Sequence, residues 1–209
     1  MSNIISKSDL AIVLSRLLRF EAPKLLQEQY VMDSEVGAAA LWHAHLLGDL
    51  NGRVIADLGC GTGILGIGAL LLGAGQVIFV DSDADALKMA QNNYSKVRSE
   101  GYKLGRTEFL KNDISKLKIK ADVVIENPPF GTKLKHADIK FLEKALETAH
   151  IVYSFHKSES KNFLQRFAAR NNANITHIWD FRFPIKSTFS FHRRQIHRVN
   201  VSCLRFERD

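Results

Sequence analysis

The sequence predicts an α/β fold with a mostly parallel sheet, on the strength of three observations. From Gly52 onward, short apolar runs typical of buried strands alternate with helical segments, a pattern that implies right-handed crossover connections. A glycine turn over 59–63 follows the first of these strands and precedes an apolar helix. The tetrapeptide at 127–130 follows a later strand, at the end where open α/β sheets place their ligands.

Length and composition bound the organisation of the chain. With 209 residues and 45% hydrophobic content, we expect a single domain over residues 1–209, with a helical cap over 1–50 and a core over 51–209. The two cysteines, Cys60 and Cys203, lie far apart, which argues against a disulfide framework or a zinc site and favours a reduced, cytoplasmic setting. The first 19 residues lack a signal-peptide core, and no run approaches the roughly 18 apolar residues of a membrane span.

The excess of positive charge is concentrated near the end of the chain. Lysine and arginine number 29 against 22 acidic residues, a net charge of +7. Between positions 181 and 206 there are six basic side chains and no acidic one: Arg182, Lys186, Arg193, Arg194, Arg198 and Arg205. Phe183, Phe189 and Phe191 lie among them, so the stretch either binds nucleic acid by stacking and phosphate contacts or is a strand whose phenylalanines face the core.

The elements follow in order from apolar spacing and from helix start and stop signals. Before the first strand, the pattern predicts a helix over 8–20, a short segment over 24–30 and an alanine-rich helix over 35–47. Strands are expected over 53–58, 76–80, 107–110, 121–126, 151–155, 174–183 and 197–206, and further helices over 64–72, 84–97, 139–149 and 160–170. His43 and His45 stand two apart on different faces of their helix, so we interpret them as surface or packing residues and not as metal ligands.

The glycine turn has two interpretations. Gly61, Gly63 and Gly66 fit the dinucleotide pattern G-x-G-x-x-G, with Asp81 about twenty residues further on as the acid that holds a ribose. The longer run Asp57-Leu58-Gly59-Cys60-Gly61-Thr62-Gly63 instead resembles the first motif of class I S-adenosylmethionine-dependent methyltransferases.

That resemblance implies a Rossmann-like seven-stranded sheet with an antiparallel C-terminal strand, and it implies S-adenosylmethionine as the cofactor. The glycines would let the backbone approach the amino-acid half of the cofactor, Asp81 would accept hydrogen bonds from the ribose, and Asp113 with Ile114 would hold the adenine. The cofactor-binding residues expected in this part of the chain are Asp57, Gly59, Cys60, Gly61, Thr62, Gly63, Ile64, Asp81, Asp113 and Ile114.

The tetrapeptide Asn127-Pro128-Pro129-Phe130 separates methyl transfer from hydride transfer, because it matches the motif of methyltransferases that modify planar amines. The lone pair of such an amine is delocalised into its ring, so the site should favour a pyramidal nitrogen. The Asn127 side-chain oxygen and the Pro128 carbonyl can each accept one amine N–H, and these bonds strengthen as positive charge develops. Phe130 can stack on the unstacked base. No metal is required.

The chain as a whole is similar to the methyltransferase-like-five family, which methylates an adenosine of small-subunit ribosomal RNA. The similarity rests on the motifs above and on the stretches at 21–30, 127–132, 152–158 and 191–194. It implies that Gln29 closes over the cofactor. Eukaryotic members have Pro and Thr where this chain has Val31 and Met32, so no hydroxyl contact is carried over there, and Thr62 replaces a Cys of some members.

The family resemblance also implies a partner, a small zinc-binding methyltransferase activator that pairs with the third strand between Thr107 and Leu110, an unpaired edge open to strand addition. For the RNA substrate, the expected contacts are Lys133, Lys135, His192, Arg193 and Arg194.

Four alternatives stay open from the residues alone. The fold could serve only as an RNA-binding module, or the chain could be a nicotinamide oxidoreductase. Among methyltransferases, DNA adenine and protein glutamine amide are the competing substrates, because the same tetrapeptide serves all three. The basic C-terminal stretch favours a nucleic acid without distinguishing RNA from DNA.

Overall fold

The computed structural model of the chain describes residues 4–19, 32–130, 137–186 and 196–208, with the side chains of 184–186 and 196–198 excepted. Its strands are β1 (Val54–Leu58), β2 (Gln76–Asp81), β3 (Arg106–Lys111), β4 (Val123–Glu126), β5 (Ile151–Lys157), β6 (Ala173–Lys186) and β7 (Ile196–Arg208). Its helices are α1 (Lys7–Ser15), α2 (Ser34–Leu46), α3 (Ile64–Leu71), α4 (Ala84–Ser99), α5 (Ala137–Thr148) and α6 (Lys161–Arg170).

The strands form one seven-stranded sheet in the order β3-β2-β1-β4-β5-β7-β6. Strands β1 to β5 pair in parallel, while β7 runs antiparallel to both β5 and β6. The predicted mostly parallel sheet with an antiparallel C-terminal strand is therefore confirmed. The chain runs outward from β1 through β2 to β3 and then crosses to β4 on the other side of β1, so the topological switch point lies between β1 and β4.

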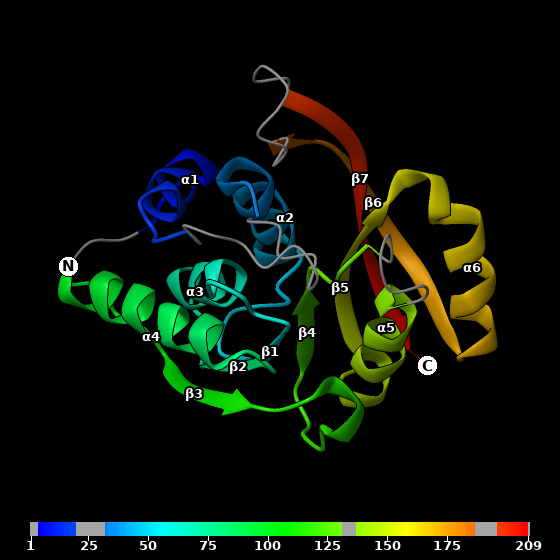
Figure 1. Cartoon of the computed structure of the whole chain (residues 1–209), viewed down its shortest axis with the longest axis horizontal. Helices are drawn as coiled ribbons and strands as arrows, with labels where there is room; N and C mark the ends of the chain where they lie inside the picture. Colours follow the sequence, from blue (N-terminus) through cyan, green and yellow to red (C-terminus); the bar gives the residue numbers. More distant parts are fainter. Residues whose placement is uncertain (1–3, 20–31, 131–136, 187–195, 209) are drawn as a thin grey trace.

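Helices cover both faces of the sheet (Figure 1). The larger apolar cluster draws its buried side chains from α1, α2, α3 and α4 on one face, and the smaller draws them from α5 and α6 on the other. Because side chains alternate along a strand, Ile55 of β1 joins the first cluster while Ala56 and Leu58 join the second.

The start of each of three helices is fixed by a short polar side chain that binds a free backbone N–H group. Ser6 caps α1 by accepting from Asp9 N–H, Asp33 caps α2, and Asp83 caps α4. The first helix is shorter than the predicted 8–20, because a tertiary contact replaces its last turn. Leu18 donates its N–H to Asn93 Oδ1 at 2.7 Å, and its carbonyl accepts from Asn93 Nδ2 at 3.1 Å.

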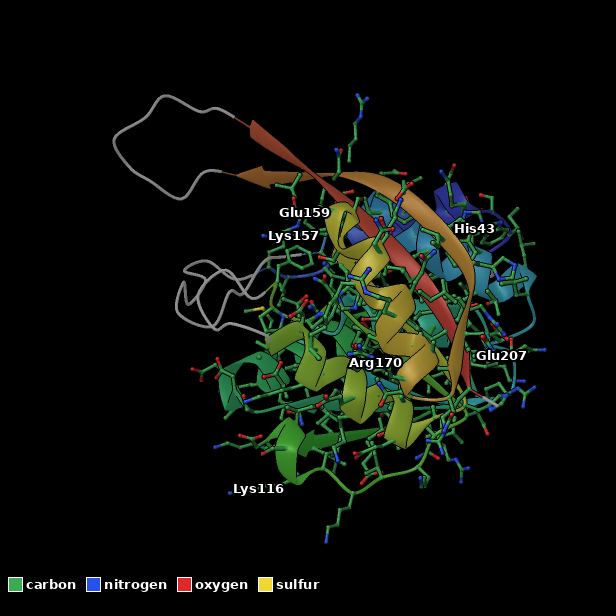
Figure 2. The ribbon with its side chains drawn as sticks, turned by 90° about the vertical axis from the view of Figure 1, so that its right-hand side faces the viewer. His43, Lys116, Lys157, Glu159, Arg170 and Glu207 are labelled. Carbon is green, nitrogen blue, oxygen red and sulfur yellow. The ribbon has the colours of Figure 1, made fainter. Side chains whose placement is uncertain are left out.

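Strands β6 and β7 form a ribbon longer than the sheet to which it belongs. They pair with each other from Ala173↔Arg208 to Lys186↔Ile196, whereas β5 pairs with β7 only as far as Lys157↔Val201. Among the described strands, residues 182–186 and 196–200 therefore pair only with one another. In Figure 2 this ribbon extends beyond the rest of the molecule.

Within the ranges described, no helix is both long enough and apolar enough to cross a membrane.

Candidate functional site

The register of the central strands brings the predicted site residues to one edge of the sheet. Leu58 of β1 pairs with Val80 of β2 and with Glu126 of β4, and Asp81 pairs with Lys111 of β3. The glycine turn, Asp81, the 112–114 segment and the tetrapeptide therefore begin at the same level on four neighbouring strands. They flank the switch point, where a ligand crevice is expected in this class of sheet.

The glycine turn takes a backbone conformation that residues with a side chain rarely adopt. Gly59, Gly61 and Gly63 have φ angles of +67°, +54° and +79°. The turn is fixed by the N–H groups of Gly59 and Cys60, which donate to the Val80 carbonyl at 2.8 and 3.0 Å. The side chains of the other three cofactor candidates on this segment, Cys60, Thr62 and Ile64, are buried, so a ligand would meet their backbone atoms.

Asp57 supplies the cap that the glycine at the start of α3 lacks. Its Oδ2 accepts from the Gly66 N–H at 2.8 Å, which satisfies a donor in the first turn of the helix. Burial raises the pKa of Asp57 to about 7, the hydrogen bond from Gly66 opposes this, and the charge of Asp81 adds to it. Asp57 therefore stabilises the junction between the glycine turn and α3.

Asp81 lies at the end of β2 beside the turn. Its Oδ2 accepts from the Gly61 N–H and its Oδ1 from the Asp83 N–H, both at 2.9 Å. Burial raises the pKa of Asp81, while these two N–H groups lower it. A carboxylate has about four acceptor positions, so each oxygen retains capacity for a ligand hydroxyl.

Asp113 and Ile114 lie one strand further out. Asp113 is exposed and caps a short 3₁₀ helix, Ile114–Lys116, by accepting from the N–H and the hydroxyl of Ser115 at 2.8 and 2.7 Å. The Ser115 hydroxyl and N–H hold the pKa of Asp113 below its usual value. Ile114 is partly buried and packs against the smaller apolar cluster.

The tetrapeptide leaves an acceptor available at the end of β4. Asn127 Oδ1 is buried and makes no hydrogen bond with any residue that the structure describes. A buried amide oxygen without a partner costs free energy, so its retention indicates a ligand donor. Pro128 is buried, Pro129 is half-buried, and Phe130 exposes 9% of its surface while packing against the larger cluster.

One residue of this region escaped the sequence analysis. Asn93 of α4 is fully buried, and besides its two bonds to Leu18 it donates from Nδ2 to the Thr62 carbonyl at 2.9 Å. It thereby ties the glycine turn to the segment after α1. Its partners lie 75 and 31 positions away, so helical spacing gave no signal of this role.

Several predicted site residues lie outside the described ranges. These are Gln29, Lys133, Lys135, His192, Arg193 and Arg194, together with the segment predicted over 24–30.

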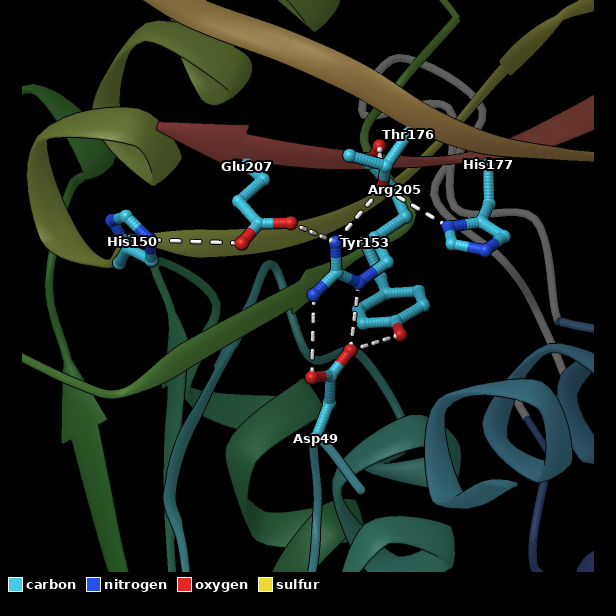
Figure 3. Close-up of polar contacts among 7 residues, drawn as sticks. All are labelled: Asp49, His150, Tyr153, Thr176, His177, Arg205 and Glu207. Atoms are coloured by element: carbon cyan, nitrogen blue, oxygen red, sulfur yellow. Dashed lines mark hydrogen bonds and ion pairs between the residues drawn. The ribbon is translucent and has the colours of Figure 1, made fainter. Parts of the chain in front are cut away.

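Arg205 belongs to the fold and not to a nucleic-acid surface, which corrects its inclusion in the basic stretch. It exposes only 7% of its surface and binds Asp49, with Nε to Oδ2 at 2.8 Å and Nη2 to Oδ1 at 3.3 Å. Tyr153 donates its hydroxyl to the same carboxylate, and Arg205 Nη1 reaches Thr176 and Glu207 (Figure 3). Phe183 is buried as well, as a core-facing strand residue would be. Arg182 is exposed.

The two histidines of α2, interpreted from the sequence as surface or packing residues, are both half-buried and lie against aromatic rings. The ring of His43 stacks on Trp179 with centroids 4.8 Å apart, and that of His45 lies 5.4 Å from Trp42. Both cysteines are free and buried. No group of three histidine, cysteine or acidic side chains arranged for a metal occurs in the described part of the chain.

Comparison with known proteins adds three findings. The family model of the methyltransferase small domain matches residues 33–152. The rRNA N(6)-adenosine-methyltransferase METTL5 of Danio rerio is 34% identical over 90% of this chain and 91% of its own length, and a Methanocaldococcus jannaschii protein is 35% identical over 98% and 95%. Among solved structures, the Pyrococcus horikoshii protein PH1948 is similar with a TM-score of 0.87 and 39% identity, covering 98% of each chain.

Proposed function

Since the chain belongs to the methyltransferase small domain family and, within it, to the family of the METTL5 rRNA N(6)-adenosine-methyltransferases, we propose that it methylates the exocyclic N6 amine of an adenosine in small-subunit ribosomal RNA, with S-adenosylmethionine as donor. Membership of this family sets aside the nicotinamide oxidoreductase and the RNA-binding module. One observation supports an amine as the methyl acceptor. The buried Oδ1 of Asn127 accepts no hydrogen bond from the described residues, and it lies at the same edge of the sheet as the glycine turn.

The strand ends fit the methyl donor in three ways. The left-handed glycines at 59, 61 and 63 leave the turn without side chains where an amino-acid moiety would approach. Asp81 has acceptor capacity for ribose hydroxyls, and Asp113 with Ile114 offers a carboxylate and an apolar surface for an adenine ring. When bound, the cofactor supplies a methyl group that its sulfonium has made electrophilic.

The residues of the tetrapeptide then act on the amine. The Asn127 oxygen and the Pro128 carbonyl would accept its two N–H groups and so orient the lone pair of the nitrogen for attack. Positive charge that develops on the nitrogen strengthens both bonds, so they lower the barrier more than they favour substrate binding. Phe130 stacks on the base, and because it packs on the core its position is fixed in advance. Pro129 keeps the segment rigid.

We assign delivery of the RNA to basic residues that follow the tetrapeptide in the sequence or lie in the sequence between β6 and β7. These are Lys133, Lys135, His192, Arg193 and Arg194, and Arg182, exposed on β6, supports the proposal. Because residues 182–186 and 196–200 extend past β5, the ribbon places positive charge beyond the body of the enzyme, where a large polyanion can contact it.

The proposed partner is a small zinc-binding methyltransferase activator that adds a strand to β3. Among the described strands, β3 lies at the edge of the sheet and pairs on one side only, with β2. Such an edge supports strand addition. Co-expression of the two proteins, followed by gel filtration, tests the complex.

We further propose that residues 1–209 act as one catalytic unit, in which the helices before β1 form the cap of the site. A cytoplasmic location accords with a ribosomal substrate and with two unpaired cysteines.

The substrate is tested by incubating the protein with labelled cofactor and, separately, ribosomal RNA, DNA and ribosomal proteins, followed by digestion and mass spectrometry. The expected product is N6-methyladenosine in ribosomal RNA alone. Label in DNA adenine or in a glutamine amide would assign the enzyme to one of the two competing substrate classes.

A further inference from the structure

Four polar side chains form a chain of contacts next to the tetrapeptide, and three of them are buried. Glu126 ends β4, Ser154 and His156 lie on β5, and Asp138, with 19% of its side chain exposed, is the second residue of α5. Glu126 and Ser154 have no exposed surface and His156 has 1%. Burial of this many polar groups beside an apolar cluster is costly unless they bind one another, so the arrangement requires an explanation.

The contacts run in one line through the serine. Ser154 Oγ lies 2.7 Å from Glu126 Oε1 and 2.8 Å from His156 Nε2. On the other side of the ring, His156 Nδ1 is buried without a hydrogen bond to the described residues, and Asp138 Oδ2 lies 3.5 Å from it, which is long for a hydrogen bond. The order Ser154, His156, Asp138 is that of a hydrolase triad, but the buried serine cannot meet a substrate.

The single hydroxyl proton of Ser154 can be donated to only one of its two neighbours. Ser154 either donates to Glu126 and accepts from an N–H at His156 Nε2, or accepts from a protonated Glu126 and donates to His156 Nε2. The second arrangement requires a proton on Glu126.

The surroundings favour the proton on Glu126. Burial raises the pKa of Glu126 to about 8, the hydrogen bond from Ser154 opposes this, and the charges of Asp138 on α5 and Asp57 on β1 add to it. For Asp138 itself, burial raises the pKa, but His156 and backbone N–H groups outweigh burial, so its pKa is lowered and it stays ionised. At neutral pH, Glu126 at one end of this line of contacts is therefore a neutral acid, and Asp138 at the other end is a carboxylate.

The position of this chain gives it a function. Glu126 immediately precedes Asn127, and Asp138 is the second residue of α5, so the two ends of the line lie at the two ends of segment 127–136. Ser154 is also the register partner of Glu126. The Glu126 Oε2 and Asn127 Oδ1 atoms, on adjacent residues, are both buried without a hydrogen bond to the described residues.

We propose that Glu126, Ser154, His156 and Asp138 are positioning residues for methyl transfer, which depend on a proton held by Glu126 and fix Asn127, the next residue, at the end of β4. The proposal rests on the function assigned above. Loss of the proton places a negative charge beside the carboxylates of Asp138 and Asp57 and turns the Ser154 hydroxyl from His156 towards Glu126. Asn127 then loses part of its support from β5.

The informative variant is Glu126→Gln, because a glutamine amide donates to Ser154 as the neutral acid does and cannot ionise. Single-turnover rates should be measured from pH 6.5 to 9.5, with cofactor affinity by calorimetry. We expect the wild-type rate to fall about tenfold per pH unit above about 8 and the variant rate to stay level through that range, within about threefold of wild type at pH 7. An alkaline fall that persists unchanged in Glu126→Gln overturns the proposal.

A second variant separates positioning from folding. Ser154→Ala should lower the rate constant by roughly tenfold to a hundredfold while cofactor affinity and substrate KM stay within about twofold. Ser158→Ala is the matched control, since that serine lies four residues further along and binds only Ser202 among described side chains. Equal rates for Ser154→Ala and its control would show that the chain serves the fold alone.

A measurement without substrate distinguishes failure of this proposal from failure of the assigned function. Glu126 has a higher pKa folded than unfolded, so its contribution to stability is lost as pH rises from about 4.5 to about 8. The melting temperature of wild type relative to Glu126→Gln should fall over this range and level off above it. If it does so while no RNA is methylated, the proton on Glu126 is present and the assigned function is wrong. A constant difference refutes the proton on Glu126.

Discussion

Replacing Arg205 by methionine should cost about 3 kcal/mol of the free energy of unfolding, because it leaves Asp49 buried without its cation. Asp49 exposes 6% of its surface, and in wild type it accepts two hydrogen bonds from Arg205 and one from Tyr153. The methionine keeps most of the apolar length of the arginine, so the change removes the charge and its donors with little loss of packing.

The size of the effect follows from which bonds remain. In Arg205→Met, the Tyr153 hydroxyl is the one side-chain donor to Asp49 that remains among the described residues. Removal of one partner of a buried pair typically costs about 3–5 kcal/mol. The lower end applies, since a buried carboxylate can also be neutralised by binding a proton. For a chain of this length, about 3 kcal/mol corresponds to a fall of roughly 6–12 °C in melting temperature.

A double-mutant cycle with urea unfolding tests the reasoning. Asp49→Asn keeps an acceptor for Arg205, and combining it with Arg205→Met should give a loss smaller than the sum of the two by at least about 1 kcal/mol. The exposed pair of Lys144 and Glu147 is the control, where Lys144→Met should cost less than about 1 kcal/mol. Additive losses at Asp49 and Arg205 would mean that the two charges do not stabilise each other.

Three further predictions concern the site. Asn127→Ala should leave cofactor affinity within a few fold and lower turnover by about two orders of magnitude or more. The control Asn92→Ala, on the exposed face of α4, should change neither quantity, and unchanged turnover in Asn127→Ala would refute the role of the acceptor. Gly66→Ala should destabilise the protein by about 2 kcal/mol in thermal unfolding, because the added Cβ would lie 2.3 Å from Phe79 Cε1. The control Gly37→Ala should be neutral or stabilising, because its Cβ would meet flexible Met32 and Leu65 atoms at 3.3 Å or more. Equal effects of the two substitutions would contradict the packing argument. Replacing Arg193 and Arg194 together by alanine should weaken RNA binding and reduce the slope of log affinity against log salt by about 2, and an unaltered slope would assign both residues to the fold.

The features of this protein that could be predicted from sequence are those that depend on residues close together along the chain. Periodicity located all seven strands, and the glycine turn and the tetrapeptide marked the ends of two of them. The carboxyl ends of parallel strands were already expected to carry the ligand site. That the glycine turn and the tetrapeptide start at the same level of the sheet became clear only from the register of β1 and β4.

What sequence reasoning missed depends on partners that are distant along the chain. Arg205 was counted as surface charge, yet its partner Asp49 is 156 positions away. Ser154 and His156 look like ordinary strand residues until β4 and α5 place carboxyl groups on either side of them. No local pattern distinguishes a buried polar side chain with partners from an exposed one, so contacts between separate elements decide such cases.

The position of β7 has a consequence for how the protein folds while it is synthesised on the ribosome. Although β7 is last in sequence, it lies between β5 and β6 in the sheet and pairs with both. Until residues 196–208 leave the exit tunnel, β6 has no neighbour in the sheet, and the β5 edge that β7 will cover stays open to other nascent chains. The enzyme therefore completes its sheet only after residues 196–208 have emerged, and Arg205 on β7 then pairs with Asp49 on the segment that joins α2 to β1.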